Sequence, residues 1–203
     1  MAKGRSVAIE IREVGPEALE QYAEIPISFH VESVFRVDEI AGGLGGLRLA
    51  EEPADKPYVK DYDECEQESP SSWTRRFDVS NWLFLMAFDG DRAVGGATVA
   101  FRSPNADMLQ GRDDLAVLWD IRVHPDYRGT GIGSALFKHA VGWARGQGCK
   151  RLKLDTQNIN VPACKFYAAW GCRLGAIDRH GYAGDARVAH EVMLNWYLDL
   201  QPC

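Results

Sequence analysis

Apolar and polar residues alternate along several stretches of the chain, and this pattern predicts strands. Residues 6–14 ("SVAIEIREV") alternate, residues 81–102 hold two apolar runs around Asp89-Gly90-Asp91, and Pro125 ends a third run at 115–125. The two runs within 81–102 predict a hairpin, because Asp-Gly is a common hairpin turn. Further strands are expected at residues 151–158 and as a closing pair at 172–180 and 190–200.

Other stretches have the spacing of amphipathic helices. Leu136, Ala140 and Trp143 share one helical face after the third strand. Shorter helices are expected at residues 15–25, which begin with Gly-Pro, and at residues 161–171, where a proline lies near the start. Together the elements predict one mixed α/β domain over residues 1–203, with a sheet flanked by helices.

Two stretches are less regular. Residues 28–40 ("SFHVESVFRVDEI") fit either a short helix or an extended segment. Residues 51–78 are acidic, contain prolines and have few aliphatic side chains, which predicts a surface excursion. The aromatic residues Tyr58, Tyr62 and Trp73 suggest that parts of this excursion are held against the domain.

Composition narrows the classes of function. The net charge of −6 argues against general nucleic-acid binding and favours a small cationic partner. No apolar run approaches the roughly 20 residues that span a bilayer, and the N-terminus lacks the apolar core of a signal peptide. A cytoplasmic protein with no membrane partner is therefore expected. The five cysteines lack the paired spacing of a metal site, so we expect reduced thiols and no bound metal.

Glycines at positions 129, 131 and 133 directly precede the predicted helix. Glycine permits positive φ and lets a ligand approach the main chain, and the N–H groups at a helix N-terminus bind anions. A connection tightened only for packing is the alternative interpretation. The Walker motif would need Gly-Lys followed by Ser or Thr, and the dinucleotide fingerprint would need a glycine where Ser134 stands.

The run from Arg128 to Gly133 ("RGTGIG") resembles the Arg/Gln-x-x-Gly-x-Gly/Ala signature of the GNAT superfamily of N-acetyltransferases. "DIRVHPDYRG" leads into it, and "NVPACKFYAAWG" places Asn160, Ala163 and Tyr167 as the family's Asn-x-x-Ala-x-x-x-Tyr does. The resemblance implies a GNAT fold, with a mixed, mostly antiparallel central sheet that is splayed at the acetyl-CoA site and flanked by helices. It also implies acetyl-CoA as co-substrate, with its pyrophosphate in the glycine loop. The residues it assigns to acetyl-CoA are Ile121, Arg122, Val123, Arg128, Gly129, Thr130, Gly131, Ile132, Gly133, Ser134, Asn160 and Tyr167.

A narrower resemblance covers most of the chain. "SFHVESVFRV", "KPYVKDYDE", "DTQNIN", "ACKFY" and "NWYL" are similar to segments of streptothricin acetyltransferases, which acetylate an amine of streptothricin antibiotics and so confer resistance. Two positions depart from that pattern. Trp119 stands where those enzymes usually have an acidic residue, and Cys172 replaces the usual phenylalanine after Gly171. The first departure leaves the acceptor open.

Acetyl transfer to an amine needs a base for the ammonium, a donor that polarises the thioester carbonyl, and an acid for the departing thiolate. Asp120 is the first candidate to bind and deprotonate the acceptor; strand alternation places it on the face opposite Trp119 and Ile121. Pairing with Arg122 is its alternative role. Asp155 is the second candidate, and pairing with Lys153 or Arg151 is its alternative. If neither aspartate serves, another carboxylate from residues 61–68 is the remaining candidate.

Three roles come only from the family resemblance. It makes Tyr167 the general acid, for which a core aromatic is the alternative interpretation. It assigns carbonyl polarisation to a main-chain N–H within residues 121–123. Asn160 would bind the pantetheine arm or cap the following helix.

Three functions fit these residues. The first is acetylation of a primary amine on a small cationic acceptor, with streptothricin-type antibiotics leading. A protein or peptide N-acetyltransferase is the second, because the acidic segment suits a basic peptide equally well. A non-catalytic acyl-CoA sensor is the third. Many GNAT proteins pair through C-terminal strands, so a homodimer is also open.

Overall fold

The computed structural model describes residues 9–64 and 69–200, and these form two compact units. The first unit comprises the described residues of 1–28, 61–152 and 200–203, and the second comprises 29–60 and 153–199. Residues 6–8 of the first predicted strand lie outside the described residues. No helix in the described part of the chain is both long and apolar enough to cross a membrane.

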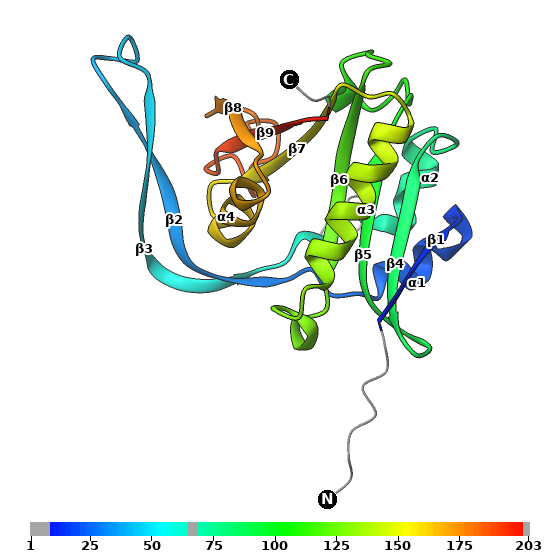
Figure 1. Ribbon diagram of the computed structural model, residues 1–203. Helices are drawn as coiled ribbons and strands as arrows, with labels where there is room; N and C mark the ends of the chain where they lie inside the picture. Colours follow the sequence, from blue (N-terminus) through cyan, green and yellow to red (C-terminus); the bar gives the residue numbers. More distant parts are fainter. Residues whose placement is uncertain (1–8, 65–68, 201–203) are drawn as a thin grey trace, which may run out of the picture. The chain divides into compact units, whose positions relative to one another are not determined.

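The first unit contains four antiparallel strands in the order β1 (Glu10–Val14), β4 (Leu83–Asp89), β5 (Arg92–Ala100) and β6 (Leu115–Val123) (Figure 1). The predicted hairpin at 81–102 is confirmed, with Gly90 at positive φ in its turn. The longest helix, α3 (Ile132–Gly146), packs on β4, β5 and β6. The short elements are η1 (Pro16–Ala18), α1 (Leu19–Ala23), η2 (Tyr62–Glu64), η3 (Pro70–Ser72), α2 (Trp73–Arg76), η4 (Asp107–Leu109) and η5 (Pro125–Tyr127).

Two adjacent glycines of β5 let different layers approach the sheet. A Cβ on Gly95 would lie 2.9 Å from Cγ2 of Ile132 in α3, and a Cβ on Gly96 would lie 2.3 Å from the ring of Tyr22 in α1. Because successive residues of a strand point to opposite faces, α1 and α3 cover opposite faces of this sheet.

An apolar core fills the α1 face of this sheet. Tyr22 lies 5.9 Å from Trp73 between ring centroids, and Trp73 is only 2% exposed. The prediction that Trp73 is held against the domain is therefore confirmed. Other buried members of this core include Leu19, Ile25, Trp82, Phe84, Met86, Phe88, Leu109 and Val117.

The second unit holds a long hairpin of β2 (Phe29–Glu39) and β3 (Leu47–Lys60), which pair antiparallel (Figure 1). It also holds most of β7 (Arg151–Gln157), α4 (Val161–Ala169), β8 (Arg173–Asp178) and β9 (Met193–Asp199). β9 lies between β7 and β8, and the predicted closing strand pair is confirmed as β8 and β9.

The structure answers two questions that the sequence left open or predicted differently. Residues 28–40 are extended and not helical, because β2 finds its partner in β3. The segment 51–78, predicted as a surface excursion, is in part regular structure: residues 51–60 belong to β3 and residues 73–76 form α2. Prolines are tolerated in β3 because a strand of a two-stranded sheet has one unpaired edge.

The mixed α/β class, with a mostly antiparallel sheet and flanking helices, is thus confirmed.

Candidate functional site

The glycine loop joins β6 to α3 within the first unit. Gly129 and Gly131 have φ of +78° and +92°, in the left-handed region that glycine adopts most readily. A Cβ at either position would meet nothing within 4 Å, so space beside the loop is open. The predicted need for glycine is confirmed at these two positions, and Gly133 has no positive φ.

The loop is braced by its own side chains. Arg128 donates from Nε to the carbonyl of Val123 at 3.0 Å and from Nη2 to the carbonyl of Ser28 at 2.7 Å. Thr130 donates its hydroxyl to the carbonyl of Tyr127 at 2.6 Å. Since these donors serve backbone carbonyls, Arg128 and Thr130 help to shape the loop.

Helix α3 begins at Ile132 without a side-chain cap and without an acidic residue in its first turn. The first four N–H groups of a helix have no intrahelical acceptor, and the helix dipole makes this end positive. Such a helix N-terminus suits the binding of an anion such as a phosphate group.

A β-bulge alters strand β6 beside the loop. Thr98 pairs with Asp120 and Val99 pairs with Leu118, so Trp119 is the extra residue. The Trp119 ring packs 4.9 Å from that of Phe77, on the face that α1 also covers. The bulge directs Asp120 to the same face as Trp119, so the predicted alternation is wrong for these two residues. Asp120 and Ile121 are in regular register and keep the predicted opposite faces.

Asp120 is bound on both of its oxygens. Oδ1 accepts from the Tyr22 hydroxyl at 2.6 Å and from Arg122 Nε at 3.0 Å, and Oδ2 accepts from Arg122 Nη2 at 2.8 Å. The side chain of Asp120 is 8% exposed and that of Arg122 is 1% exposed. The geometry therefore matches the alternative role of Asp120, as the partner of Arg122.

Arg122 also reaches the segment 61–64. Its Nη1 donates to Asp63 Oδ2 at 2.7 Å and to the carbonyl of Ile25 at 3.1 Å, and its Nη2 donates to Asp63 Oδ1 at 3.3 Å. With the two bonds to Asp120, all five N–H groups of the guanidinium have acceptors. The Arg122 side chain consequently has no donor left for acetyl-CoA.

Burial and charge set the protonation states of this group. Burial, followed by the charge of Asp120, raises the pKa of Tyr22 well above its usual value, so the phenol stays protonated and donates. Burial alone would lower the pKa of Arg122, but Asp120, Tyr22 and Asp63 raise it. Burial raises the pKa of Asp63, and its bonds to Arg122 offset part of that rise.

The second unit carries the other predicted residues. The side chain of Asn160 accepts from the N–H of Ala163 at 3.1 Å, which confirms that it caps α4. Tyr167 lies on α4 and is 6% exposed.

Asp155 on β7 accepts a hydrogen bond from the hydroxyl of Tyr182 at 3.0 Å. Burial raises the pKa of Asp155 above its usual value, while the Tyr182 bond and the charge of Lys153 offset part of the rise. A raised folded-state pKa stabilises the protein at low pH, and this stabilisation is lost as the pH rises through the folded-state pKa.

We therefore expect Asp155→Asn, which keeps the acceptor for Tyr182 and removes the charge, to gain stability relative to the wild type as the pH rises from 4 to 8. Urea denaturation of both proteins across this range measures the difference in unfolding free energy. Groups shared by both proteins cancel in that difference. A difference that stays constant with pH would contradict the buried-charge account.

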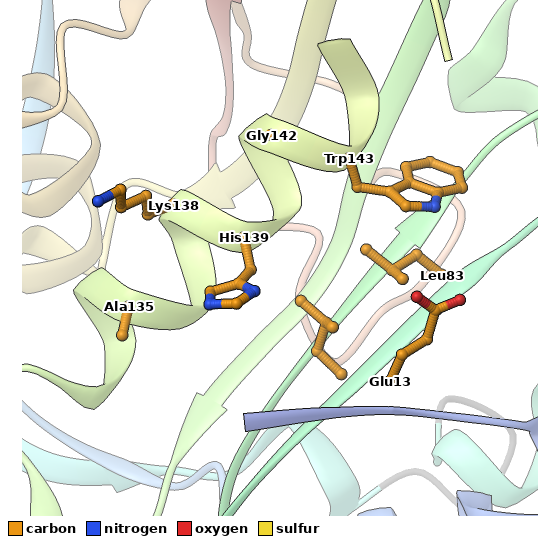
Figure 2. Close-up of a pocket in the computed structure, with 8 residues that line it drawn as sticks. Glu13, Leu83, Ala135, Lys138, His139, Gly142 and Trp143 are labelled. Carbon is orange, nitrogen blue, oxygen red and sulfur yellow. The ribbon is translucent and has the colours of Figure 1, made fainter. Parts of the chain in front are cut away.

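A separate hollow lies beside α3 in the first unit, with a volume of about 620 Å³ (Figure 2). None of the predicted site residues lines it. Its lining consists of Glu13 from β1, Leu83 and Leu85 from β4, and Ala135, Lys138, His139, Gly142 and Trp143 from α3.

Comparison with models of protein families shows to which family this chain belongs. Residues 28–172 match the model of the Acetyltransferase (GNAT) family. This match covers well over half of the chain. The chain belongs to the GNAT acetyltransferase family.

Individual relatives are similar to this chain over a longer stretch than the family model. A streptothricin acetyltransferase of Streptomyces lavendulae is 32% identical over 195 residues, covering 96% of this chain and 95% of the relative. Streptothricin acetyltransferase A of Bacillus subtilis (strain 168) is 31% identical over 153 residues, covering 75% and 80%. The protein is thus an N-acetyltransferase of this family.

Solved structures agree with this GNAT assignment. The crystal structure of nourseothricin acetyltransferase has a TM-score of 0.75 at 27% identity and covers 96% of this chain and 99% of its own. A Bacillus anthracis str. Ames protein assigned to the streptothricin acetyltransferases, solved in complex with acetyl coenzyme A, has a TM-score of 0.74 at 26% identity and covers 95% and 99%.

Two residues of the candidate site of this GNAT acetyltransferase were not named individually in the sequence analysis. Tyr22 was expected only as part of a short helix, and Asp63 only as one of the carboxylates within residues 61–68. Asp63 lies in the acidic run "KDYDE", which was a usable signal. Tyr22 had none, because its bond to Asp120 spans 98 residues of sequence.

Proposed function

We propose that this enzyme transfers acetyl from acetyl-CoA to a primary amine of a small cationic acceptor, with streptothricin as the leading substrate. One observation carries the choice of acceptor. The Streptomyces lavendulae relative, named for streptothricin, aligns over 96% of the chain, well beyond the residues 28–172 that match the general family model. Acetylation of such an antibiotic would make the protein a resistance enzyme.

The glycine loop is the proposed site for the pyrophosphate of acetyl-CoA. The open space at Gly129 and Gly131 and the uncapped first turn of α3 support this role. The main-chain N–H groups of residues 132–134 would be the donors. Arg128 and Thr130 would hold the loop in shape through their bonds to backbone carbonyls.

Acetyl-CoA supplies the acetyl group as a thioester, so the reaction forms a nitrogen–carbon bond, breaks the carbon–sulfur bond and moves one proton from the amine to the thiolate. We assign the donation of that proton to Tyr167 Oη, since a phenol with a pKa of about 10 suits an alkyl thiolate. An acceptor ammonium, with a pKa of about 10.4, needs a carboxylate that binds it and helps remove its proton. Asp155 and the Asp120 group provide carboxylates in the two units.

Acetyl-CoA turnover over a panel of amines, read by thiol release, tests this function. We expect streptothricin to have a higher kcat/KM than a basic histone-like peptide. A preference for the peptide would instead identify a peptide N-acetyltransferase. Binding of acetyl-CoA without thiol release on any amine would identify a sensor.

The loop assignment has its own test in Gly131→Val. A β-branched residue is strained at a φ of +92°, so the loop must change shape. We expect acetyl-CoA binding, measured by calorimetry, to weaken at least tenfold, or about 1.4 kcal/mol.

Gly148→Val is the matched control, because Gly148 has a φ of +77° and open space around it at the other end of α3. Its strain is similar, but it lies away from the proposed phosphate site. Near-normal affinity in a folded Gly131→Val protein, or equal losses in both variants, would refute the loop assignment.

A further inference from the structure

One buried guanidinium in the first unit joins two carboxylates that lie far apart in the sequence. Arg122 binds Asp120 with Nε and Nη2, and it binds Asp63 with Nη1 and Nη2. Its remaining donor reaches the carbonyl of Ile25. With all five donors used, Arg122 is fixed in place and has no group left to contact a substrate.

The carboxylates on either side of Arg122 differ in access. Asp120 is 8% exposed, and both of its oxygens accept bonds from Tyr22 and Arg122. Asp63 is 24% exposed, and each of its oxygens accepts one bond from Arg122. A carboxylate has about four lone-pair positions, so Asp63 can accept further bonds from a solvent-borne donor and Asp120 has little room to do so.

The charges of this group do not cancel. Among the residues that the structure describes, the charges of Arg122, Asp120 and Asp61 act on Asp63, so one cation faces three carboxylates there. The N–H of Asp63 donates to Asp61 Oδ1 at 3.0 Å, which fixes the turn that presents Asp63. A cation that reached Asp63 would balance charge that the protein itself leaves in excess.

We propose that Arg122 is a positioning residue that presents Asp63 to the ammonium group of the acceptor. Asp120 holds the guanidinium of Arg122 in place, and Tyr22 in turn holds Asp120. This inference rests on the proposed amine acetyltransferase function. It assigns acceptor binding in the first unit to Asp63 of the acidic segment, and it gives Asp120 the task of holding Arg122. Burial raises the pKa of Asp63, and the bonds to Arg122 offset only part of that rise.

The test compares Asp63→Asn with Glu64→Gln under steady-state conditions, using streptothricin and acetyl-CoA as substrates. Glu64 is the exposed neighbour in the same turn, so its variant removes the same charge without touching Arg122. We expect Asp63→Asn to raise KM for streptothricin at least tenfold, the effect of losing one charge-assisted hydrogen bond. KM for acetyl-CoA should stay within about twofold of the wild type, and Glu64→Gln should change neither constant by more than about twofold.

Asp63→Glu covers the case in which Asp63→Asn fails to fold. It keeps the charge but moves the carboxylate by one methylene, so KM for streptothricin should rise while KM for acetyl-CoA holds. Arg122→Lys keeps the cation and loses the two-pronged contact, and it should raise the same constant.

Several outcomes would overturn the inference: an unchanged KM for streptothricin in the Asp63 variants, a parallel rise in both Michaelis constants, or equal effects of Asp63→Asn and Glu64→Gln. Failure of the proposed function is a different result, because the wild-type enzyme would then prefer the basic peptide to streptothricin, or bind acetyl-CoA and acetylate no amine.

Discussion

Replacing Tyr167 with phenylalanine is expected to lower kcat for acetyl transfer about 10²- to 10⁴-fold, the usual contribution of a general acid. The change removes one hydroxyl and almost no volume, so the packing of α4 should persist. Since the proposed role of the hydroxyl is to protonate the thiolate as it leaves, acetyl-CoA affinity should change little. Steady-state kinetics with streptothricin, together with calorimetric titration of acetyl-CoA, separates the two quantities.

Tyr58→Phe is the control for this experiment. Tyr58 lies on β3 of the same unit and is 41% exposed, so the same chemical change there should leave kcat near the wild-type value. If Tyr167→Phe retains wild-type turnover as well, Tyr167 is a core aromatic and the acid must be sought elsewhere.

The largest effect on stability is expected for Arg122→Met. The substitution keeps an apolar stem of similar length but leaves Asp120 and Asp63 without their cation. Asp63 is partly exposed and can regain some hydration, whereas Asp120 is buried. Removing one partner from a buried ion pair typically costs about 3–5 kcal/mol, because the remaining charge has neither water nor a counter-ion. Urea denaturation at neutral pH measures the loss.

Arg112→Met provides the comparison. Arg112 pairs with Asp114 at 2.8 Å in the same unit, but both side chains are about one-third exposed. Surface pairs of this kind contribute about 0–1 kcal/mol. Equal, small losses in the two variants would mean that solvent reaches Asp120 and Asp63 well enough to replace Arg122.

Elements with a strong local pattern were predictable. The hairpin of β4 and β5 combines apolar runs with an Asp-Gly turn, and α3 combines an apolar face with glycines at both ends. Residues 28–40 were ambiguous because Val31, Val34 and Phe35 fit helical spacing while β-branched residues favour strands. Their pairing with residues 47–60 decided the outcome, and a local pattern does not contain that partner.

The candidate site also has one part that the sequence predicts and one that it does not. The glycine loop was predictable because its backbone demands are local, as the positive φ values of Gly129 and Gly131 show. The side-chain network around Arg122 was not predictable, since its bond to Asp63 spans 59 residues. The bulge at Trp119 placed Asp120 and Trp119 on the same face, against the expectation, because one extra residue changes the alternation of a strand.

The adjacent glycines of β5 limit how this enzyme can diverge. A side chain at position 95 would press on Ile132 and Leu136, at the start of the helix that we assign to the cofactor. A side chain at position 96 would press on Tyr22, which holds Asp120. A substitution at either of these two positions therefore requires a compensating change at a different neighbouring residue. A larger residue at 96 requires a smaller one at 22, which removes the hydroxyl that binds Asp120. A larger residue at 95 requires smaller residues at 132 or 136, and it also approaches the carbonyl of Arg122, so a change at either glycine reaches the Arg122 network.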